Sequence, residues 1–247
     1  MKKVLISFSV IALVAAVAIG ATVAYFSDTE TSTGNTFTAG SIDLKVDSEC
    51  TYNGEESDEC GSWELKDLVG DTQDGDGEIV LGDRFFNFKD IKPGDEGENT
   101  ISLHVINNDA WVCAEVSNLS SDDNGLNEPE ALVDTTDGTG NGELDDTMLW
   151  TIWRDDGDNI QQENEPTLAS GHPSNSVLPV YDATTGTGSL EGGTTTYLGF
   201  SWTLPAESGN ETQTDSLTAD ISFRVEQARN NDDFRCVPVQ EPTGDQT

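Results

Sequence analysis

The sequence predicts an all-β protein, a jelly-roll-like β-sandwich of two antiparallel sheets with long acidic loops. Apolar and polar residues alternate with a period of two in several segments, and residues that favour turns separate these segments. After the first 24 residues, no segment shows apolar residues at helical spacing. Many half-buried strands joined by Gly- and Asp-rich turns are typical of a sandwich or a jelly roll.

The alternating segments follow one another along the chain. In the first, residues 41–47, the side chains of Ile42, Leu44 and Val46 share one face. The last and longest runs from Leu217 to Val225. The other predicted strands are residues 100–107, 111–116, 148–153 and 198–204. Together they predict a sandwich domain at residues 41–239, followed by a flexible polar tail at residues 240–247.

The first 24 residues are typical of a secretory signal peptide. Two lysines follow Met1, and then come an uncharged, mostly apolar run from Val4 to Ile19 and several small residues. Cleavage near Ala24 would release about 220 residues to the cell surface or the extracellular matrix, with no membrane contact expected afterwards. The alternative is a retained signal anchor, because a span needs about 20 apolar residues and this run approaches that length.

The chain is strongly acidic, with 47 acidic and 11 basic residues and a formal net charge of −36, which becomes −38 once Lys2 and Lys3 leave with the signal. Such a field repels nucleic acid and anionic lipid, so neither is an expected partner, and it attracts cations. High charge also occurs in disordered chains, but five Trp, nine Phe and the alternating segments argue for a core. The acidic residues concentrate in three predicted loops, at residues 71–83, 122–146 and 155–165.

Four cysteines in a chain routed outward predict disulfides rather than free or metal-bound thiols, since no CxxC spacing is present. Four cysteines allow three pairings, and the sequence alone does not determine which one forms. The short polar loop between Cys50 and Cys60 favours a local pair, which would leave Cys113 to join Cys236.

No catalytic site is expected. The chain has two histidines, His104 in a predicted strand and His172 in a Gly-His-Pro turn, and it has no HExxH, GxSxG or Gly-rich phosphate loop. His104 as the base of an unusual triad is the alternative to a structural strand histidine, which we favour. The sequence therefore predicts a protein that is not an enzyme and holds no organic cofactor.

Three acidic segments have the oxygen-rich composition of calcium sites. One, from Asp137 to Asp145, follows the spacing of a calcium-binding loop, although Met148 stands at the twelfth position, where a glutamate is expected. A second has a similar spacing, and a third has the oxygen density without the spacing. The alternative is that all three are solvated loops of a salt-adapted protein. The candidate Ca²⁺ ligands are Asp74, Asp76, Asp83, Asp137, Thr139, Asn141, Asp145, Asp155, Asp156 and Asp158.

Two glycosylation sequons begin at Asn118 and Asn210. Both lie near predicted turns, where surface acceptors are expected. Sequons also occur by chance at about this frequency, so they decide little about function.

A threonine-rich segment lies between the signal peptide and the first predicted strand, at residues 25–40. Its composition favours extended structure. Such an arm either forms an edge strand of its own domain or completes the sheet of another copy, in which case the contact repeats head to tail and gives a homopolymer. The expected polymerisation arm consists of Phe26, Ser27, Asp28, Thr29, Glu30, Thr31, Ser32, Thr33, Gly34, Asn35, Thr36 and Phe37.

Two parts of the sequence resemble the TasA/camelysin family. Residues 21–30 (ATVAYFSDTE), followed by residues 35–44 (NTFTAGSIDL), closely resemble the start of its members. Residues 91–95 (IKPGD) match a Pro-Gly-Asp turn that usually precedes a strand in this family, a less specific feature. The resemblance covers about the first 110 residues, and the acidic loops and residues 227–231 are similar to archaeal members.

The resemblance implies a function. Members of the family carry a signal peptide that a SipW-type peptidase processes, TasA-like proteins are jelly-roll subunits of biofilm-matrix fibres, and archaeal relatives form bundling pili. In these fibres the N-terminal segment of a mature subunit inserts into the adjacent subunit as a donor strand, which residues 26–38 would supply here. Because this chain is more acidic than typical bacterial members, bundling is expected to need divalent cations that screen like charges.

The same family name implies a rival function, because camelysin is described as a surface metallopeptidase. Two isolated histidines and the absence of a zinc-binding helix in the sequence argue against it. A monomeric cell-surface adhesin is a third possibility, in which the sandwich binds other molecules without polymerising.

Overall fold

The computed structural model describes residues 42–56, 60–68, 72–73, 79–80 and 83–238. The expected signal peptide at residues 1–24, the arm at residues 25–40 and the tail at residues 240–247 lie outside these described residues. β-Strands are the main regular structure of the described residues, and the all-β sandwich predicted from the sequence is confirmed.

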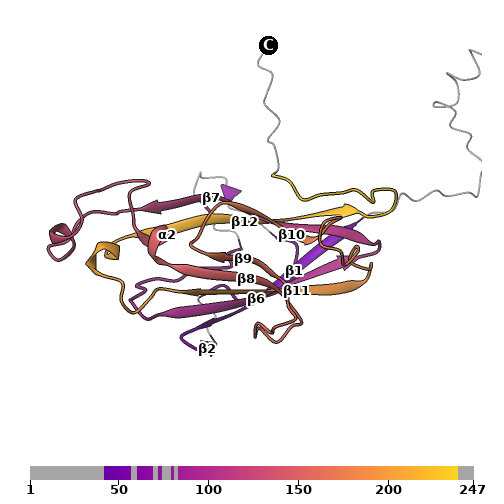
Figure 1. The fold of residues 1–247 in the computed structure, drawn as a ribbon, viewed down its shortest axis with the longest axis horizontal. Coiled ribbons are helices and arrows are strands. Elements are labelled where there is room, and N and C mark those ends of the chain that lie inside the picture. The colour runs from indigo at the N-terminus through magenta and orange to yellow at the C-terminus, as the bar shows by residue number, and fades with distance from the viewer. Residues whose placement is uncertain (1–41, 57–59, 69–71, 74–78, 81–82, 239–247) are drawn as a thin grey trace, which may run out of the picture. The chain divides into compact units, whose positions relative to one another are not determined.

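Two antiparallel sheets form the layers of the sandwich (Figure 1). The larger has the order β2 (Glu55–Glu56), β1 (Asp43–Tyr52), β6 (Glu96–Ile106), β11 (Thr194–Thr203), β8 (Leu149–Asp155) and β9 (Thr167–Gly171), and β3 (Trp63–Lys66) also pairs with β1. The smaller has the order β10 (Ser176–Tyr181), β7 (Ala110–Asp122) and β12 (Ser216–Gln227). A separate hairpin joins β4 (Thr72–Gln73) to β5 (Ile79–Val80), inside the first predicted acidic loop.

The six predicted strands correspond to β1, β6, β7, β8, β11 and β12, and the structure extends most of them. The Pro-Gly-Asp turn before β6 also forms: Asp95 N donates to Lys92 O at 2.9 Å, and Gly94 has a φ of 94°. The sequence does not predict β9 or β10. Pro179 argues against a strand, yet β10 accommodates it at a register shift on the edge of its sheet.

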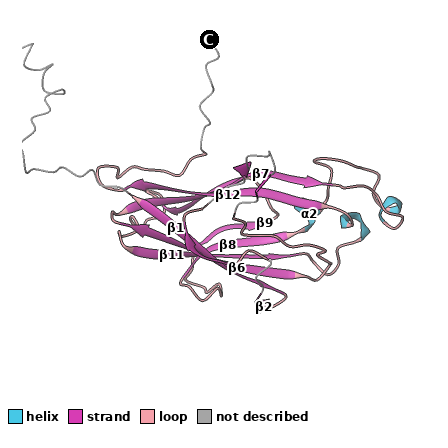
Figure 2. Cartoon of the chain, turned by 180° about the vertical axis from the view of Figure 1, so that it is seen from behind, coloured by secondary structure: helices cyan, strands magenta, loops and turns pink. Residues whose placement is uncertain are grey.

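Within the described part of the chain, three short helical segments lie in the loops: η1 (Glu130–Leu132), α2 (Leu144–Thr147) and η2 (Asn210–Thr212). Each has at most four residues, which is too short to produce a helical period in the sequence. Figure 2 shows the helical turns, in cyan, at one end of the sandwich. The predicted acidic loop at residues 122–146 is therefore partly ordered into two helical segments.

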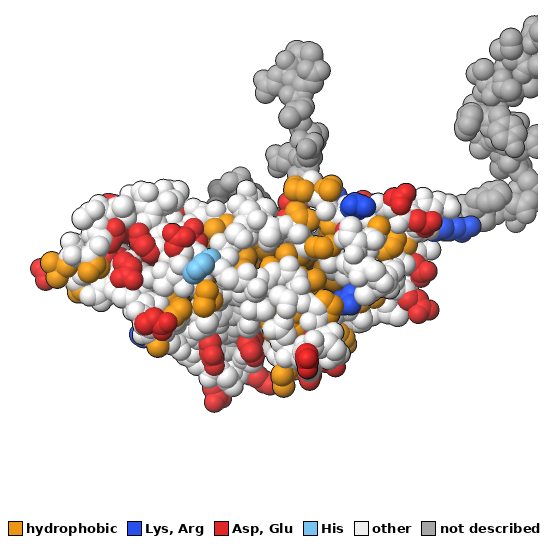
Figure 3. Space-filling view, in the orientation of Figure 1, with side chains coloured by type: hydrophobic (Ala, Val, Ile, Leu, Met, Phe, Trp, Pro, Cys, Tyr) orange, Lys and Arg blue, Asp and Glu red, His pale blue; other side chains and the backbone are white. Residues whose placement is uncertain are grey.

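Acidic side chains dominate the surface. Figure 3 shows many Asp and Glu side chains across one face of the molecule and few Lys or Arg side chains. Among the described residues, Lys45 pairs with Asp67 at 3.3 Å and Lys92 with Asp90 at 2.7 Å. Such exposed pairs are few against 47 acidic residues, so most of the negative charge faces solvent without a cationic partner.

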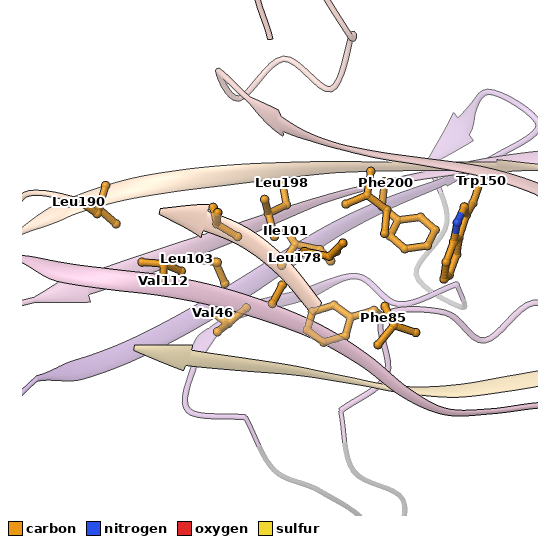
Figure 4. Packing of buried hydrophobic residues seen from close by; sticks show 14 of the residues in the cluster. Val46, Phe85, Ile101, Leu103, Val112, Trp150, Leu178, Leu190, Leu198 and Phe200 are labelled. Carbon is orange, nitrogen blue, oxygen red and sulfur yellow. The ribbon is translucent and has the colours of Figure 1, made fainter. Parts of the chain in front are cut away.

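The core fills the space between the two sheets (Figure 4). Val46, Leu103 and Leu198 enter it from the larger sheet, and Val112 and Val180 from the smaller one; each is at most 2% exposed. Burying such a side chain stabilises the fold by about 1.5–3 kcal/mol. The alternating positions that predicted the strands therefore supply the core.

One tryptophan is buried on the opposite face of the larger sheet. Trp150 and Ile152 point into the core, so the next residue, Trp153, points outward, yet it is only 1% exposed. Its indole lies over Gly199 of the neighbouring strand β11, and its Nε1 donates to Asp155 at 3.0 Å. Gly199 is thus required at this position, since a Cβ atom there would lie 2.0 Å from the indole ring.

Two disulfides join Cys50 to Cys60 and Cys113 to Cys236, which is the pairing that the short loop favoured. The first connects β1 to the segment before β3, and the second connects the central strand β7 to the segment after β12. The second bond closes a separation of 123 residues, so it ties the C-terminal segment to the centre of the smaller sheet.

Candidate assembly edge and candidate metal centre

β12 is one edge of the smaller sheet. Its inner neighbour β7 pairs with it from Ser216, opposite Asp122, to Gln227, opposite Ala110. On its other side, β12 has no strand partner among the described residues. It has 12 residues and no proline or lysine, but it includes Arg224, and its pairing with β7 shifts register between Thr218 and Asp220. Long edges without proline or lysine are templates for pairing with another strand.

The inner face of β12 is incompletely covered. Its apolar side chains pack against the core, yet each remains partly exposed: Leu217, Ile221, Phe223 and Val225. The corresponding side chains of β7, such as Val112 and Val116, are at most 3% exposed. Phe85 covers part of this region, with its ring centroid 5.7 Å from that of Phe223. One more strand beside β12 would bury the rest of these apolar surfaces.

The opposite edge of the same sheet, β10, is better protected. Pro179 cannot donate a backbone hydrogen bond, and a register shift follows it. The guanidinium of Arg154 donates to Val180 O at 3.3 Å and lies 4.7 Å from the centroid of the Tyr181 ring. We call β12 the open edge, because no described strand pairs with its outer side, whereas Pro179 and the contact from Arg154 of β8 protect β10.

A second feature is a group of four carboxylates at the end of the sandwich that carries α2 (Figure 1). They come from four segments of the chain: Asp123 follows β7, Glu130 begins η1, Glu143 precedes α2 and Asp215 precedes β12. Oxygens of three of them lie within 4.8 Å of one another, and the fourth contacts this trio through its backbone. The carboxylate cluster consists of Asp123, Glu130, Glu143 and Asp215.

The loop after β7 brings these residues together by local hydrogen bonds. Asp123 and Gly138 exchange backbone hydrogen bonds of 3.2 and 3.1 Å, which folds the intervening loop back on itself. Asn127 N donates to Glu130 Oε2 at 3.2 Å, and Glu130 N donates to Asn127 Oδ1 at 3.1 Å. This reciprocal pair resembles a capping box and holds the Glu130 side chain inward.

Every carboxylate of the cluster has one buried oxygen that no described donor reaches. Glu130 is fully buried and Asp123 is 3% exposed, so water cannot replace the missing donors freely. The other oxygens are satisfied: Asp123 Oδ1 accepts from Gly125 N at 2.8 Å, and Asp215 Oδ2 accepts from Glu143 N at 2.7 Å. Buried charges without partners are costly, and proteins usually pair them or use them as metal ligands.

The electrostatics of the cluster follow from this burial. Burial, together with the negative charges of Asp215 and Asp134, raises the pKa of Glu143 to about 7. Burial and the charges of neighbouring carboxylates likewise raise the pKa of Asp215 to about 6, although the hydrogen bond from Glu143 N opposes the rise. No Lys or Arg occurs at residues 93–153 or 155–223, so the cluster's own segments supply no positive charge.

The predicted ligands Asp155, Asp156 and Asp158 do converge, with oxygens within 4.8 Å of one another. The oxygens of Asp155 and Asp158, however, already accept hydrogen bonds. Asp155 Oδ2 accepts from Gly157 N at 2.8 Å and Asn159 N at 3.0 Å, and its Oδ1 binds the Trp153 indole. These bonds shape a turn that covers the tryptophan, so the group has a structural role whether or not it binds a cation.

The other predicted calcium loops stay predictions. Asp74 and Asp76 lie outside the described residues, and Asp83 forms an ion pair with Lys66. The predicted ligands Asp137, Thr139 and Asn141 are exposed, and Asn141 Nδ2 donates to Asp137 O at 2.8 Å. Asp145 lies in α2, and its backbone N donates to Ser121 Oγ at 3.3 Å. This loop forms a turn against the end of β7 beside the carboxylate cluster.

Both histidines have hydrogen-bond partners. His104 lies between Asp47 and Thr195, with Nε2 3.0 Å from Asp47 Oδ2 and Nδ1 2.9 Å from Thr195 Oγ1. The order of acid, base and hydroxyl resembles a triad, but all three residues sit on neighbouring strands and bridge the outer face of the larger sheet. His172 Nδ1 lies 3.0 Å from Met148 O. Both histidines therefore make contacts that link adjacent elements.

The sequons differ in their surroundings. Asn210 is exposed and begins η2, in a loop as expected. Asn118 was expected near a turn but lies inside β7, at a φ of 51°, where the pairing with β12 shifts register. Its side-chain amide donates to Asp220 at 2.7 Å across the two strands, so the placement near a turn was wrong, although the side chain is exposed.

Sequence reasoning missed the carboxylate cluster. Its members span residues 123–215 and follow no local spacing, so only the fold brings them together. One local pattern was available: Asn-x-x-Glu at residues 127–130 has the spacing of a capping box. This pattern predicts that the Glu130 side chain binds backbone groups of its own loop and does not extend into solvent.

Comparison with known proteins finds a family match for the N-terminal residues of this chain. Residues 1–56 match the model of the camelysin metallo-endopeptidase family, and no curated protein matches the chain significantly. Among the described residues, no helix has both the length and the apolar character needed to cross a membrane. The matched segment contains the motif at residues 21–44 and the whole of β1. The resemblance of this chain to the TasA/camelysin family is thus confirmed over residues 1–56.

Proposed function

We propose that this protein is a secreted structural subunit of an extracellular filament, and that each subunit donates its N-terminal arm to the open edge of the next. The observation that carries the proposal is the incomplete cover of β12, a 12-residue strand that has one described strand partner and partly exposed apolar side chains. Main-chain pairing along such an edge supplies affinity, and inward side chains supply register.

The arm suits this edge in length and pattern. Residues 26–37 equal β12 in number, so one arm is long enough to pair along the whole strand. In extended conformation Thr29, Thr31 and Thr33 share one face without charge, while Asp28 and Glu30 share the other. The uncharged face would cover the apolar side chains of β12, and the acidic face would stay in solvent.

The geometry of the contact favours a filament rather than a closed dimer. Arm and open edge are different surfaces, so the contact is heterologous and leaves one free arm and one free edge at the two ends of any oligomer. The large negative charge opposes side-by-side association, so we propose that divalent cations assist bundling of filaments for a biofilm matrix or a pilus.

The proposal is tested with mature protein that lacks the signal and with a variant that also lacks residues 26–37. We expect filaments by electron microscopy from the first and monomers by light scattering from the second. A synthetic peptide of residues 26–37 should bind the truncated monomer and stop filament growth by the full chain. Filaments formed without the arm would overturn the mechanism.

A matched pair of point variants sharpens this test. Thr31→Asp places a charge on the face that would contact β12, whereas Ser32→Asp adds the same charge one residue along, on the solvent face. We expect Thr31→Asp to weaken peptide binding at least tenfold and Ser32→Asp to leave it within about twofold, because an unpaired buried charge is costly. Equal effects of the two variants would contradict the proposed orientation.

The family description supports a second candidate, a surface metallo-endopeptidase. Both histidines of the chain are described, and neither belongs to a group of potential metal ligands with two other His, Cys, Asp or Glu residues among the described residues. Casein hydrolysis by the mature protein, measured with and without a chelator, separates this function from the filament. Chelator-sensitive cleavage that co-purifies with the monomer would favour the peptidase.

A further inference from the structure

We propose that the carboxylate cluster is a structural calcium site and binds one Ca²⁺ ion. The proposal rests on buried oxygens and does not depend on the filament function. Oxygens of Asp123, Glu130 and Asp215 lie within 4.8 Å of one another where β7 ends and β12 begins, and the backbone N of Glu143 binds Asp215. Each of these four carboxylates has one buried oxygen that no described hydrogen-bond donor reaches.

Burial is the first step of the reasoning. Glu130 is fully buried and Asp123 is 3% exposed, yet Glu130 Oε1 and Asp123 Oδ2 have no described partner. No described Lys, Arg or His forms an ion pair with any of the four residues. Since a buried carboxylate without a partner is strongly unfavourable, the buried pair Asp123 and Glu130 favours a positive charge that no described Lys, Arg or His supplies.

The donor set decides which cation fits. All the converging groups are carboxylate oxygens, and the cluster contains no sulfur or imidazole ligand, which argues against zinc. The ligands come from irregular loops and a helix terminus, and such flexible settings suit the six to eight oxygens that surround Ca²⁺. Mg²⁺ requires stricter octahedral geometry and retains several waters, so we expect it to bind more weakly.

The second acidic group of the protein provides a natural contrast. Asp155, Asp156 and Asp158 also have oxygens within 4.8 Å of one another, but Asp156 and Asp158 are exposed and Asp155 is saturated with hydrogen bonds. None of these three residues has a buried oxygen without a partner. Proximity of carboxylates is therefore common to both groups, whereas buried, unpartnered oxygens distinguish the carboxylate cluster.

An ion at the carboxylate cluster would have a defined mechanical effect. Asp215 immediately precedes β12, Asp123 immediately follows β7, and Glu130 and Glu143 lie in the loop between β7 and β8. Coordination would tie both strand ends to that loop. Removing the ion would leave mutually repelling carboxylates at the same point, so the start of β12 should loosen first.

The test uses mature full-length protein, treated with a chelator and then dialysed into buffer with 1 M NaCl to screen general surface binding. Calorimetric titration with CaCl₂ should show one site, and Ca²⁺ at about 100 times its Kd should raise Tm by about 5–10 °C. MgCl₂ at the same concentration should give less than half of that shift.

Two variants and one control locate the ion. Glu130→Gln and Glu143→Gln keep the side-chain volume and remove one charge each, so each should lower calcium affinity at least tenfold while the calcium-free protein stays folded. The double variant Asp156→Asn/Asp158→Asn removes two charges from the other acidic group and should leave the affinity within about twofold.

Three outcomes would overturn the proposal: no heat and no Tm shift with the wild-type protein, an undiminished calcium effect in both glutamine variants, or a loss of binding only in the asparagine control. A protein that gains stability at low pH but ignores calcium would also overturn it, because shared protons would then satisfy the cluster. Filament formation is not measured in this test, so its result is independent of the polymerisation mechanism.

Discussion

The close contact between Trp153 and Gly199 makes a quantitative prediction about the substitution Gly199→Ala. The new Cβ atom would lie 2.0 Å from Cε2 and Cζ2 of the indole, whereas carbon atoms in contact are normally about 3.5 Å apart. The indole must therefore move by about 1.5 Å. It is 1% exposed and packed on all sides, and its Nε1 would leave Asp155, now 3.0 Å away.

Two costs add in this variant. Overpacking of a filled site costs about 1–3 kcal/mol, and loss of a hydrogen bond to a charged acceptor costs about 1.5–3 kcal/mol. We expect Gly199→Ala to lower the free energy of unfolding by about 2.5–6 kcal/mol. With a urea m-value of about 2.5 kcal/mol/M, the midpoint should fall by about 1–2.4 M. Circular dichroism during urea unfolding measures this change.

A double-mutant cycle separates the clash from any general effect of alanine in β11. Trp153→Ala alone should cost about 3–5 kcal/mol, and adding Gly199→Ala to it should cost nothing further, because the clashing ring is gone. Ser201→Ala, on the same face of the same strand, is the control and should change stability by less than about 0.5 kcal/mol. Additive costs in the double variant would refute the reasoning.

Three further predictions follow from other contacts. Removing the Cys113–Cys236 disulfide should lower the free energy of unfolding by about 5 kcal/mol, and removing Cys50–Cys60 by about 3 kcal/mol. In the chain-entropy description the difference arises because the first disulfide closes 123 residues and the second only 10. Urea unfolding of the two variants with both cysteines replaced by Ser checks this order. Tyr52 should ionise only near pH 12, because burial and the hydrogen bond to Asp95 raise its pKa to about 12. The difference between ultraviolet pH titrations of the wild-type protein and the Tyr52→Phe variant measures this midpoint. The fold raises the pKa of Glu143 from 4.5 to about 7, so between these values the native state binds more protons than the unfolded state, and stability without calcium should fall as pH rises through that window. Glu143→Gln should flatten this dependence in urea midpoints measured from pH 4 to 8, and an unchanged slope would contradict the assignment.

Period-two alternation predicted the strands because it is a local property. Ile42, Leu44 and Val46 must share a face in any extended strand, whichever strand lies beside them. The local disulfide could be anticipated for a similar reason, since a short loop keeps Cys50 near Cys60 in any compact state. The motif at residues 21–44 likewise indicated the family from contiguous residues, and the match over residues 1–56 agrees with it.

Other features depend on which strands become neighbours, and no local pattern contains that information. The alternation in β12 is as regular as that of a central strand, yet β12 lies at the edge of its sheet among the described residues, and its apolar side chains stay partly exposed. The burial of Trp153 on the outer face depends on a glycine of the adjacent strand and on the turn that Asp155 organises.

The sequence by itself determined the β class, the strand positions, the acidic surface and the family resemblance, because each rests on residue types and spacings along one stretch of chain. Only the tertiary structure decided which carboxylates among 47 acidic residues matter most. Asp123 and Asp215 are far apart in sequence and meet because β7 pairs with β12. Burial removes the water that would otherwise solvate these two carboxylates, and that change of surroundings cannot be seen in the order of the residues.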